Sequence, residues 1–345
     1  MSGLRSVAQQ LVGDNKGILA ADESTKTMSS RLEKVGVAGT DENRRAYREM
    51  LITTRNLSRW ISGVILSDDI FHSHLAGGRP FPQACRDFGL LTGVKVDIGA
   101  KPLAGAQAET VTEGLDGLRD RLAAYARDGA QFTKWRAVFQ IGGNMPSLRA
   151  LAANAHALAR YAALAQEAGL VPIVEPEVLM GGRHSLEQCE VATEVTLRAV
   201  FGELVQQGVW LEGMVLKPNM VVPGSDAPQQ ATVDTVAAVT IELLRRTVPA
   251  AVPGIAFLSG GQGAELATAH LAAMVALGPH PWEVTFSFGR ALVDPALEAW
   301  HGDPGRVSAG QQALAARSRA NSEARRSRLR ASRPEIGSAP SPLAF

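Results

Sequence analysis

Eight short apolar segments recur along the chain, with starts 30 to 46 residues apart, and this spacing constrains the fold more than any other feature. The segments are residues 17–21, 63–66, 94–98, 132–139, 171–174, 214–216, 254–258 and 284–286. Helical patterns lie between them, for example over residues 147–168 and 188–206. Strand and helix alternating eight times predict an α/β fold, a (β/α)8 TIM barrel in a single domain.

An open, doubly wound parallel sheet is the alternative architecture. It usually has fewer strands, and it often carries a glycine fingerprint in the turn after its first strand. Here the first segment continues into the sequence ADESTK, which has no such glycines. The pattern therefore favours the closed barrel and keeps the open sheet as the alternative.

Charge is close to balanced over the whole chain but uneven near its end. The net charge of +1 argues against bulk electrostatic binding of nucleic acid or membranes. Residues 317–333 carry +6 without interleaved aromatic residues, which favours a solvated last helix over a nucleic-acid site. We expect residues 1–333 to form the barrel, including this basic helix, and residues 334–345 to form a flexible tail rich in Pro, Ser, Gly and Ala.

Two cysteines, Cys85 and Cys189, are too few for a disulfide framework and are typical of a reduced, cytoplasmic protein. The first residues contain no long apolar segment of the kind found in signal peptides. The longest uncharged stretch, residues 247–264, is interrupted by prolines and glycines, which indicates a loop and a buried strand instead of a membrane span. We expect a cytoplasmic protein without membrane partners.

Polar or charged residues stand at the ends of seven of the eight expected strands. The charged ones are Asp22, Lys95, Asp97, Lys134, Arg136, Glu175, Glu177, Lys217 and Arg290. Any one of them has an ordinary explanation as a strand-end charge that reaches solvent. Charges inside strands are costly unless paired, and the C-terminal ends of barrel strands carry the chemistry of this fold. Their recurrence therefore predicts one site at the barrel mouth.

Spacing and turn composition indicate the charge of the ligand. Lys134 and Arg136 are two residues apart, as are Glu175 and Glu177, so each pair lies on one face of its strand. The turns Ser-Gly-Gly after the seventh strand and Phe-Gly-Arg after the eighth expose backbone N–H groups beside Arg290. Barrels bind phosphate with these two loops, so we expect a substrate with phosphate groups.

Metal and nucleotide cofactors find little support in the sequence. His72 and His74 form the only close histidine pair in the sequence, and no carboxylate stands at a spacing that would complete a metal site with them. We therefore interpret them as an ordinary surface or half-buried pair. No P-loop motif is present. We therefore predict no metal and no cofactor.

A lysine on a barrel strand can act covalently in the absence of a metal. Its amine forms a Schiff base with a carbonyl substrate, and the iminium then accepts electrons from a breaking bond. The amine must lose its proton part of the time, and burial and a neighbouring cation favour the neutral form. Lys217 follows an apolar strand and precedes Pro218, and Lys134 is the expected neighbouring cation.

The motifs taken together resemble class I fructose-1,6-bisphosphate aldolase. In chain order they are LAADEST, VKVD, KWR, VPIVEPE, LKPNM, FLSGGQ and FSFGRAL. The resemblance extends over some 300 residues, from about residue 15 to about residue 322. It implies a TIM barrel, a metal-independent Schiff-base mechanism in glycolysis or gluconeogenesis, and a homotetramer. The implied reaction is the reversible cleavage of fructose 1,6-bisphosphate to dihydroxyacetone phosphate and glyceraldehyde 3-phosphate.

The resemblance also implies a role for each matching residue. Lys217 corresponds to the Schiff-base lysine, and Glu175 to the acid–base group that acts on the carbinolamine. Asp22 corresponds to the group near the cleaved bond, Lys134 to a charge-stabilising cation, and Glu177 to a further member of the carboxylate cluster. The residues matching the 1-phosphate site are Ser259, Gly260, Gly289 and Arg290. Those matching the 6-phosphate region are Ser24, Thr27, Lys95 and Arg136, with Arg31 beside the substrate channel.

One departure and two alternatives stay open. The family's turn after the first strand reads Ser-Thr-Gly-Ser, whereas this chain has Ser24-Thr25-Lys26-Thr27, which changes the detail of 6-phosphate binding. A transaldolase-type Schiff-base enzyme is an alternative, although its motif order differs. A catalytically silent phosphosugar-binding or scaffolding barrel is another, although such a protein would be expected to lose Lys217, Glu175 or Asp22.

Overall fold

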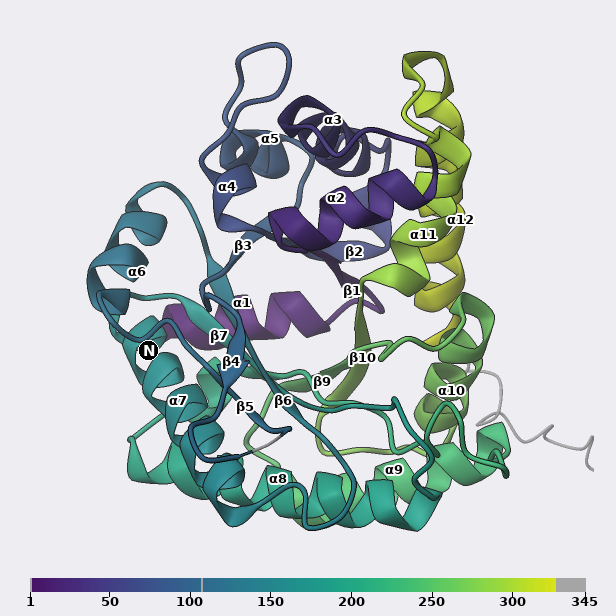
Figure 1. Cartoon of the computed structure of the whole chain (residues 1–345). Helices are drawn as coiled ribbons and strands as arrows, with labels where there is room; N and C mark the ends of the chain where they lie inside the picture. The colour runs from purple at the N-terminus through teal and green to yellow at the C-terminus, as the bar shows by residue number, and fades with distance from the viewer. Residues whose placement is uncertain (1, 107, 327–345) are drawn as a thin grey trace, which may run out of the picture.

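A computed structural model describes residues 2–106 and 108–326, and its centre is a closed barrel of eight parallel strands (Figure 1). The strands are β1 (Gly17–Ala21), β2 (Ile61–Leu66), β3 (Leu91–Lys95), β6 (Phe132–Phe139), β7 (Val171–Val178), β8 (Val215–Leu216), β9 (Gly254–Phe257) and β10 (Glu283–Phe288). Their order around the barrel is β1-β10-β9-β8-β7-β6-β3-β2. The α/β barrel prediction is confirmed, and closure of β1 against both β2 and β10 excludes the open sheet.

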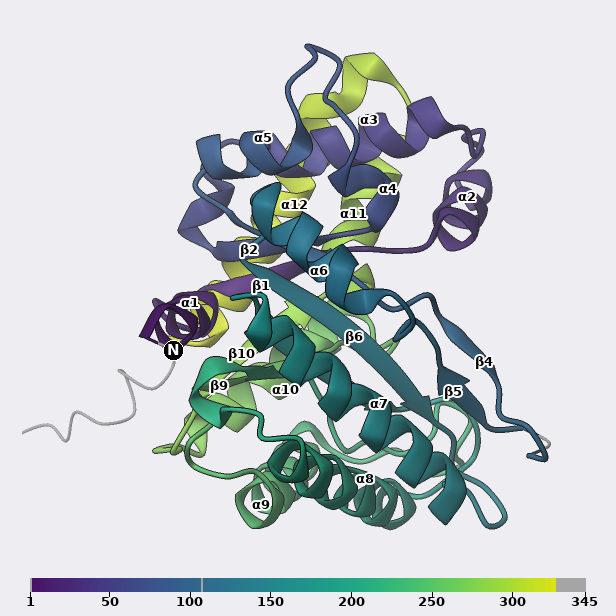
Figure 2. The same ribbon diagram turned by 90° about the vertical axis from the view of Figure 1, so that its left-hand side faces the viewer.

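Helices surround the barrel, and α7, α8 and α9 pack side by side along one flank (Figure 2). The helices are α1 (Ser2–Val12), α2 (Thr25–Lys34), α3 (Asp41–Ile52), α4 (Asp68–Phe71), α5 (Phe81–Asp87), α6 (Leu118–Arg127), α7 (Leu148–Glu167), α8 (Leu186–Gln206), α9 (Val233–Thr247), α10 (Ala264–Ala276), α11 (Arg290–Trp300) and α12 (Val307–Ala324). Short 3-10 turns occupy Leu57–Arg59, Leu211–Gly213 and Pro304–Arg306. A hairpin of β4 (Ala100–Pro102) and β5 (Thr110–Thr112) follows β3. Among the described residues, no helix is both long enough and apolar enough to cross a membrane.

The strand boundaries agree with the sequence pattern at two strands and differ by one to four residues at an end of each of the other six. Residues 17–21 and 132–139 are strands as expected. The third strand starts and ends earlier than expected, so that Asp97 lies in the loop after β3 and not within the strand. The strand before Lys217 contains only Val215 and Leu216. The backbone N–H of Lys217 nevertheless donates to Val174 O at 2.8 Å, which continues the ladder to β7.

Apolar side chains fill the lower half of the barrel and leave its mouth for polar groups. α1 packs Leu4, Leu11 and Val12 against inward residues of the strands. The ring of Phe132 lies across the barrel, where a Cβ on Gly93 would come within 2.2 Å of it. These contacts close the N-terminal end of the barrel, so a ligand can enter only from the C-terminal end of the strands.

The basic segment near the chain end is less solvated than its composition suggests. The first residues of this basic segment belong to α12. One of them, Arg317, is largely buried against α10, where it pairs with Glu265. Arg325 is 5% exposed and donates to Val284 O and Val12 O at 2.8 Å each. The prediction of a solvated helix is therefore wrong for these two arginines, because Arg325 donates to backbone carbonyls at the barrel bottom and Arg317 donates to Ala264 O and Thr268 Oγ1 of α10. The predicted tail, residues 334–345, lies outside the described residues.

Candidate active site

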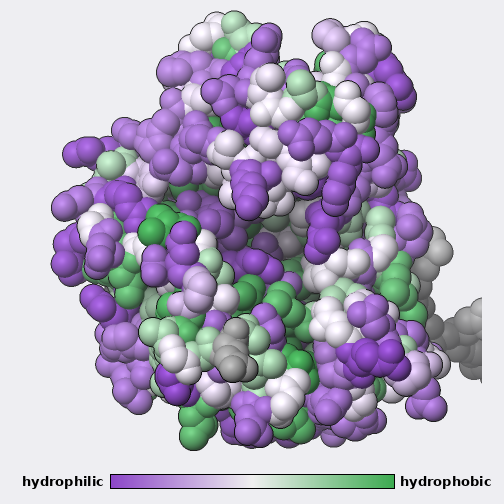
Figure 3. Space-filling model, viewed as in Figure 1, coloured by the Kyte–Doolittle hydropathy of each residue, from purple (hydrophilic) through white to green (hydrophobic). Residues whose placement is uncertain are grey.

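A pocket of about 930 Å³ opens at the C-terminal end of the barrel strands. All fourteen residues expected at the site line it: Asp22, Ser24, Thr27, Arg31, Lys95, Lys134, Arg136, Glu175, Glu177, Lys217, Ser259, Gly260, Gly289 and Arg290. Figure 3 shows a hollow in the middle of the face seen in Figure 1, with hydrophilic residues above it and hydrophobic residues below it. Residues spread over more than 260 positions of the sequence therefore share one cavity.

A chain of ion pairs connects two lysines and two carboxylates at the centre of this pocket. Lys134 on β6 places its Nζ 2.6 Å from Asp22 Oδ2 and 3.1 Å from Glu175 Oε2. The other oxygen of Glu175, on β7, lies 3.1 Å from Lys217 Nζ. The side chains of Lys134, Lys217 and Glu175 are 5% exposed or less. The Glu175 carboxylate thus lies between the two amines, and its Oε1 is close enough to Lys217 Nζ to exchange a proton with it.

The charges in this network set one another's ionisation. Burial alone would raise the pKa of Asp22, but Lys134 and Lys217 outweigh it and lower that pKa to about 2. The same two lysines outweigh burial at Glu175 and hold its pKa below the ordinary value. Burial lowers the pKa of Lys134, whereas Asp22 and Glu175 more than reverse this and raise it. At neutral pH both carboxylates are ionised and Lys134 is a fixed cation.

The lowered pKa of Asp22 predicts a pH-dependent stability. A carboxyl whose pKa is lower in the folded than in the unfolded protein stabilises the fold above its unfolded pKa, and this stabilisation is lost as pH falls through the folded pKa. For Asp22, with a pKa of about 2 against 3.8, the contribution is about 2 kcal/mol. The free energy of unfolding, measured with urea, should therefore fall faster between pH 4 and pH 2 in the parent than in Asp22→Asn. Parallel curves over that range would contradict the pairing.

Two further ion pairs line the rim of the pocket. Arg136 Nε lies 2.5 Å from Glu177 Oε2, because β6 and β7 are neighbours and both side chains face the barrel mouth. Burial lowers the pKa of Arg136, but Glu177 outweighs it and raises that pKa. Lys95 Nζ lies 2.6 Å from Asp97 Oδ1. Both cations are thus held at the rim, where an anionic ligand group can reach them.

The turns after β9 and β10 meet at one side of the pocket. Gly260 and Gly261 have φ of 60° and 96°, in the left-handed region that favours glycine. A Cβ on Gly261 would lie 3.2 Å from Arg290 Nη2, so the guanidinium lies directly over this turn. Within the described part of the chain, no hydrogen bond or ion pair engages the Arg290 side chain. Exposed N–H groups beside an unpaired arginine are suited to binding a phosphate.

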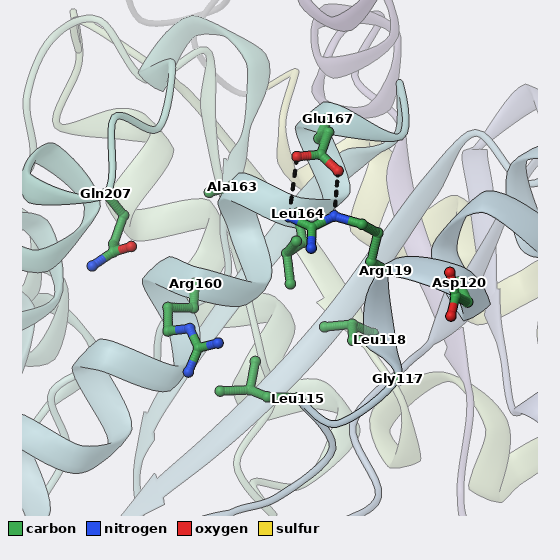
Figure 4. A pocket seen from close by; sticks show the side chains of 10 residues that line it. All are labelled: Leu115, Gly117, Leu118, Arg119, Asp120, Arg160, Ala163, Leu164, Glu167 and Gln207. Carbon is green, nitrogen blue, oxygen red and sulfur yellow. Dashed lines mark hydrogen bonds and ion pairs between the residues drawn. The ribbon is translucent and has the colours of Figure 1, made fainter.

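The other features considered from the sequence lie apart from this cluster. A groove of about 490 Å³ between α6 and α7 contains the Arg119–Glu167 ion pair and Arg160 (Figure 4), and none of the fourteen expected residues lines it. His72 and His74 are exposed. Among the described residues, no group of three or more His, Cys, Asp or Glu side chains could hold a metal ion. Cys85 and Cys189 are buried, free cysteines.

Comparison with known protein families identifies the chain. The family model described as fructose-bisphosphate aldolase class-I matches residues 3–341. The chain belongs to the class I fructose-bisphosphate aldolase family. It therefore catalyses the reversible aldol cleavage of fructose 1,6-bisphosphate to dihydroxyacetone phosphate and glyceraldehyde 3-phosphate, which is a lyase reaction of glycolysis. Enzymes of this family form a Schiff base on a lysine and use no metal. The resemblance seen in the motifs is confirmed, and the transaldolase alternative is excluded.

Aldolases from distant organisms are similar to nearly the whole chain. A probable class 1 fructose-bisphosphate aldolase of Xanthomonas campestris pv. campestris is 52% identical over 92% of this chain and 96% of its own length. Fructose-bisphosphate aldolase B of Gallus gallus is 49% identical over 92% of this chain and 88% of its own. A solved structure of the Plasmodium falciparum aldolase, in complex with TRAP and a small molecule inhibitor, has a TM-score of 0.93 and 42% identity, with 95% of each chain covered.

Several residues of this aldolase pocket were missed by sequence analysis. Glu23 accepts hydrogen bonds from Arg31 and from the fully buried Arg48, whose Nη2 lies 2.6 Å away. Asp294 on α11 accepts from the other side of Arg31. Ser287 on β10 also lines the pocket, and its buried Oγ has no partner among the described residues. The ADEST motif contained Glu23, but only the fold shows that this carboxylate orients Arg31.

Proposed function

We propose that Lys217 is the nucleophile of this aldolase and that Glu175 is its acid–base partner. The observation that carries the proposal is the buried chain of contacts Lys217–Glu175–Lys134–Asp22 at the pocket floor. An amine 3.1 Å from an ionised carboxylate can give up its proton and become nucleophilic. Among the described residues, Lys134 is the only further lysine that contacts Glu175, and Lys134 also forms an ion pair with Asp22.

The proposed steps balance protons and electrons. Glu175 takes a proton from Lys217, and the free amine adds to the C2 carbonyl. Glu175 then protonates the resulting hydroxyl, which leaves as water and gives an iminium. Asp22 removes the proton of the C4 hydroxyl, the C3–C4 bond breaks, and its electron pair moves into the iminium to give an enamine. Glyceraldehyde 3-phosphate leaves, and C3 protonation and hydrolysis release dihydroxyacetone phosphate and restore Lys217.

The two phosphates of the substrate are assigned to opposite sides of the pocket. The 1-phosphate is placed at Ser259, Gly260, Gly289 and Arg290, where two glycine turns present N–H groups beside a guanidinium. The 6-phosphate is placed at the other rim, among Ser24, Thr27, Arg31, Lys95 and Arg136. Glu177 is proposed to hold Arg136 in position through their 2.5 Å ion pair. Anchoring both ends keeps the reacting carbons close to Lys217 and Asp22.

Arg290→Ala is expected to weaken binding of the 1-phosphate in particular. A charged hydrogen bond to phosphate is worth about 1.5–3 kcal/mol, so kcat/KM should fall by about tenfold to a hundredfold or more. The loss should be similar for fructose 1,6-bisphosphate and fructose 1-phosphate, because both carry the 1-phosphate. Arg160→Ala, in the groove of Figure 4, removes a surface arginine as a matched control. Unchanged kinetics of Arg290→Ala on both ketoses would place the phosphate elsewhere.

Cleavage activity is expected to survive removal of metal ions. The iminium on Lys217 accepts the electrons of the breaking bond, so the proposed steps need no Lewis acid. Prolonged dialysis against EDTA should leave kcat for fructose 1,6-bisphosphate cleavage within about twofold of the untreated value. Loss of activity that zinc then restores would contradict the proposed mechanism.

We propose that the chain works in the cytoplasm as a homotetramer. Relatives described as cytosolic or cytoplasmic aldolases of Arabidopsis thaliana and Cicer arietinum, each 50% identical, support the location. The family resemblance supports the assembly, and residues 1–333 are proposed as the folded unit with residues 334–345 as a tail. Sedimentation velocity at micromolar concentration tests the assembly, because a tetramer of 36.5 kDa chains and a monomer sediment as separate species.

A further inference from the structure

A buried histidine outside the pocket contacts the residue that follows the loop proposed to bind the 1-phosphate. This loop, Ser259–Gly261 (residues 259–261), is closed by Gln262, whose backbone N–H donates to Ser259 O at 3.0 Å. The Gln262 side chain points away from solvent and is 8% exposed. Its Oε1 lies 2.6 Å from Nδ1 of His270, which is on α10 and 3% exposed.

The neighbours of Gln262 fix the direction of this hydrogen bond. Gln262 Nε2 lies 3.4 Å from Met220 Sδ, a weak acceptor that favours the NH₂ end of the amide facing it. Oε1 therefore faces His270, and Nδ1 of His270 must carry the proton and donate. Burial also lowers the pKa of His270, which favours a neutral ring with its single proton on Nδ1. Met220 follows Lys217 by three residues, so Gln262 links the phosphate loop to the segment that carries the nucleophile.

The helix that carries His270 is itself firmly attached. Thr268 Oγ1, also on α10, donates to Asn321 Oδ1 at 2.8 Å and accepts from Arg317 Nη2 at 2.7 Å. Both of these partners lie on α12. α10 begins at Ala264, two residues after Gln262, so its position sets where the phosphate loop ends. His270 is thus a donor on a fixed element, aimed at Gln262, the residue that follows the glycine-rich loop.

We propose that His270 is a positioning residue: through its hydrogen bond to Gln262 it holds the Ser259–Gly261 loop in the shape that binds the 1-phosphate. The proposal rests on the placement of that phosphate given above. Two consecutive glycines in the left-handed region leave this loop little rigidity of its own, so an external contact is needed to keep its N–H groups aligned. A loop that shifts by an ångström loses phosphate contacts before it loses fold stability.

Kinetics of the reverse reaction, aldol condensation, distinguish this positioning role from a purely structural one. Dihydroxyacetone phosphate carries the 1-phosphate and glyceraldehyde 3-phosphate carries the other, so the two KM values report on the two sides of the pocket. His270→Leu should raise KM for dihydroxyacetone phosphate by about fivefold to tenfold, and KM for glyceraldehyde 3-phosphate by less than about twofold. Gln262→Leu removes the same hydrogen bond from the loop side and should give the same selective rise, which keeps the test open if one variant fails to fold.

Two control variants complete the design. His270→Asn should restore the parent KM, because the amide nitrogen of asparagine and Nδ1 of histidine are both attached to Cγ. Thr268→Val removes two hydrogen bonds between α10 and α12 without touching Gln262, while Arg317 still pairs with Glu265 and keeps α10 in place, so it should lower the melting temperature and leave both KM values unchanged.

Three outcomes would overturn the proposal. The first is an equal rise of both KM values in His270→Leu. The second is a rise in KM for dihydroxyacetone phosphate in His270→Asn that is as large as in His270→Leu. The third is a rise in KM for dihydroxyacetone phosphate alone in Thr268→Val. Arg290→Ala, measured in the same assay, shows whether such a result contradicts only the role of His270 or also the assignment of the 1-phosphate. If it raises KM for dihydroxyacetone phosphate and His270→Leu does not, only the role of His270 is wrong. If Arg290→Ala has no effect, the phosphate assignment is wrong as well.

Discussion

Lys217→Met is expected to lower kcat for cleavage of fructose 1,6-bisphosphate by more than about 10⁴-fold, a loss on the scale seen when a covalent nucleophile is removed. Methionine has a similar length but no amine, so it can form no Schiff base. The substitution is compatible with folding, because the site is 3% exposed and Lys134 still pairs with Glu175. The measurement is the steady-state cleavage rate, coupled to oxidation of glyceraldehyde 3-phosphate.

Lys101→Met is the matched control for this variant. Lys101 lies on the exposed hairpin strand β4 and does not line the pocket, so its rate should equal that of the parent. Thermal unfolding of both variants separates lost chemistry from lost structure. A folded Lys217→Met protein with a rate within tenfold of the parent would mean that another residue is the nucleophile.

Glu175→Gln is expected to lower kcat by about 10²–10⁴-fold, the range for removal of a general acid–base group. Glutamine keeps the shape of the side chain and can still contact Lys134 and Lys217. It cannot take a proton from Lys217, and it cannot give one to the carbinolamine hydroxyl. Formation of the iminium should therefore become slow, while binding of both phosphates, and with it the affinity for dihydroxyacetone phosphate, should change little.

Glu167→Gln serves as the control for this substitution. Glu167 pairs with Arg119 at the surface groove of Figure 4, and it does not line the pocket that contains Glu175. A loss in Glu175→Gln no larger than that in Glu167→Gln would contradict the acid–base role. A catalytically silent barrel would be expected to lose Lys217, Glu175 or Asp22, but all three line the pocket, so this alternative is not supported.

Much of the barrel and of its pocket could be predicted because both follow from local periodicity. The eight apolar segments recur at a regular interval, and their ends meet at one rim whichever helices connect them. The two-residue spacing of Lys134 and Arg136 places both on one face of β6, and both line the pocket. The same reasoning holds for Glu175 and Glu177 on β7.

The remaining features depend on contacts between distant segments, which no local pattern encodes. In the sequence, Arg325 is indistinguishable from the other arginines of the basic segment. In the structure it is buried, because it donates to backbone carbonyls at the end of α1 and along β10. Glu23 stands beside Asp22 in the sequence, but the register of the chain after β1 turns it toward Arg31 and Arg48. Asp97 lies beyond β3 because the strand ends at Lys95, three residues before the end that its apolar pattern indicates.

Borohydride trapping shows directly whether Lys217 forms the Schiff base. The full chain is incubated with dihydroxyacetone phosphate, reduced with borohydride, digested and mapped by mass spectrometry, with Lys217→Met treated in parallel. We expect one stably modified lysine, in the peptide that contains residues 215–220, and no modification in the variant. A label on Lys134 or Lys95, or an active enzyme that cannot be trapped at all, would contradict it.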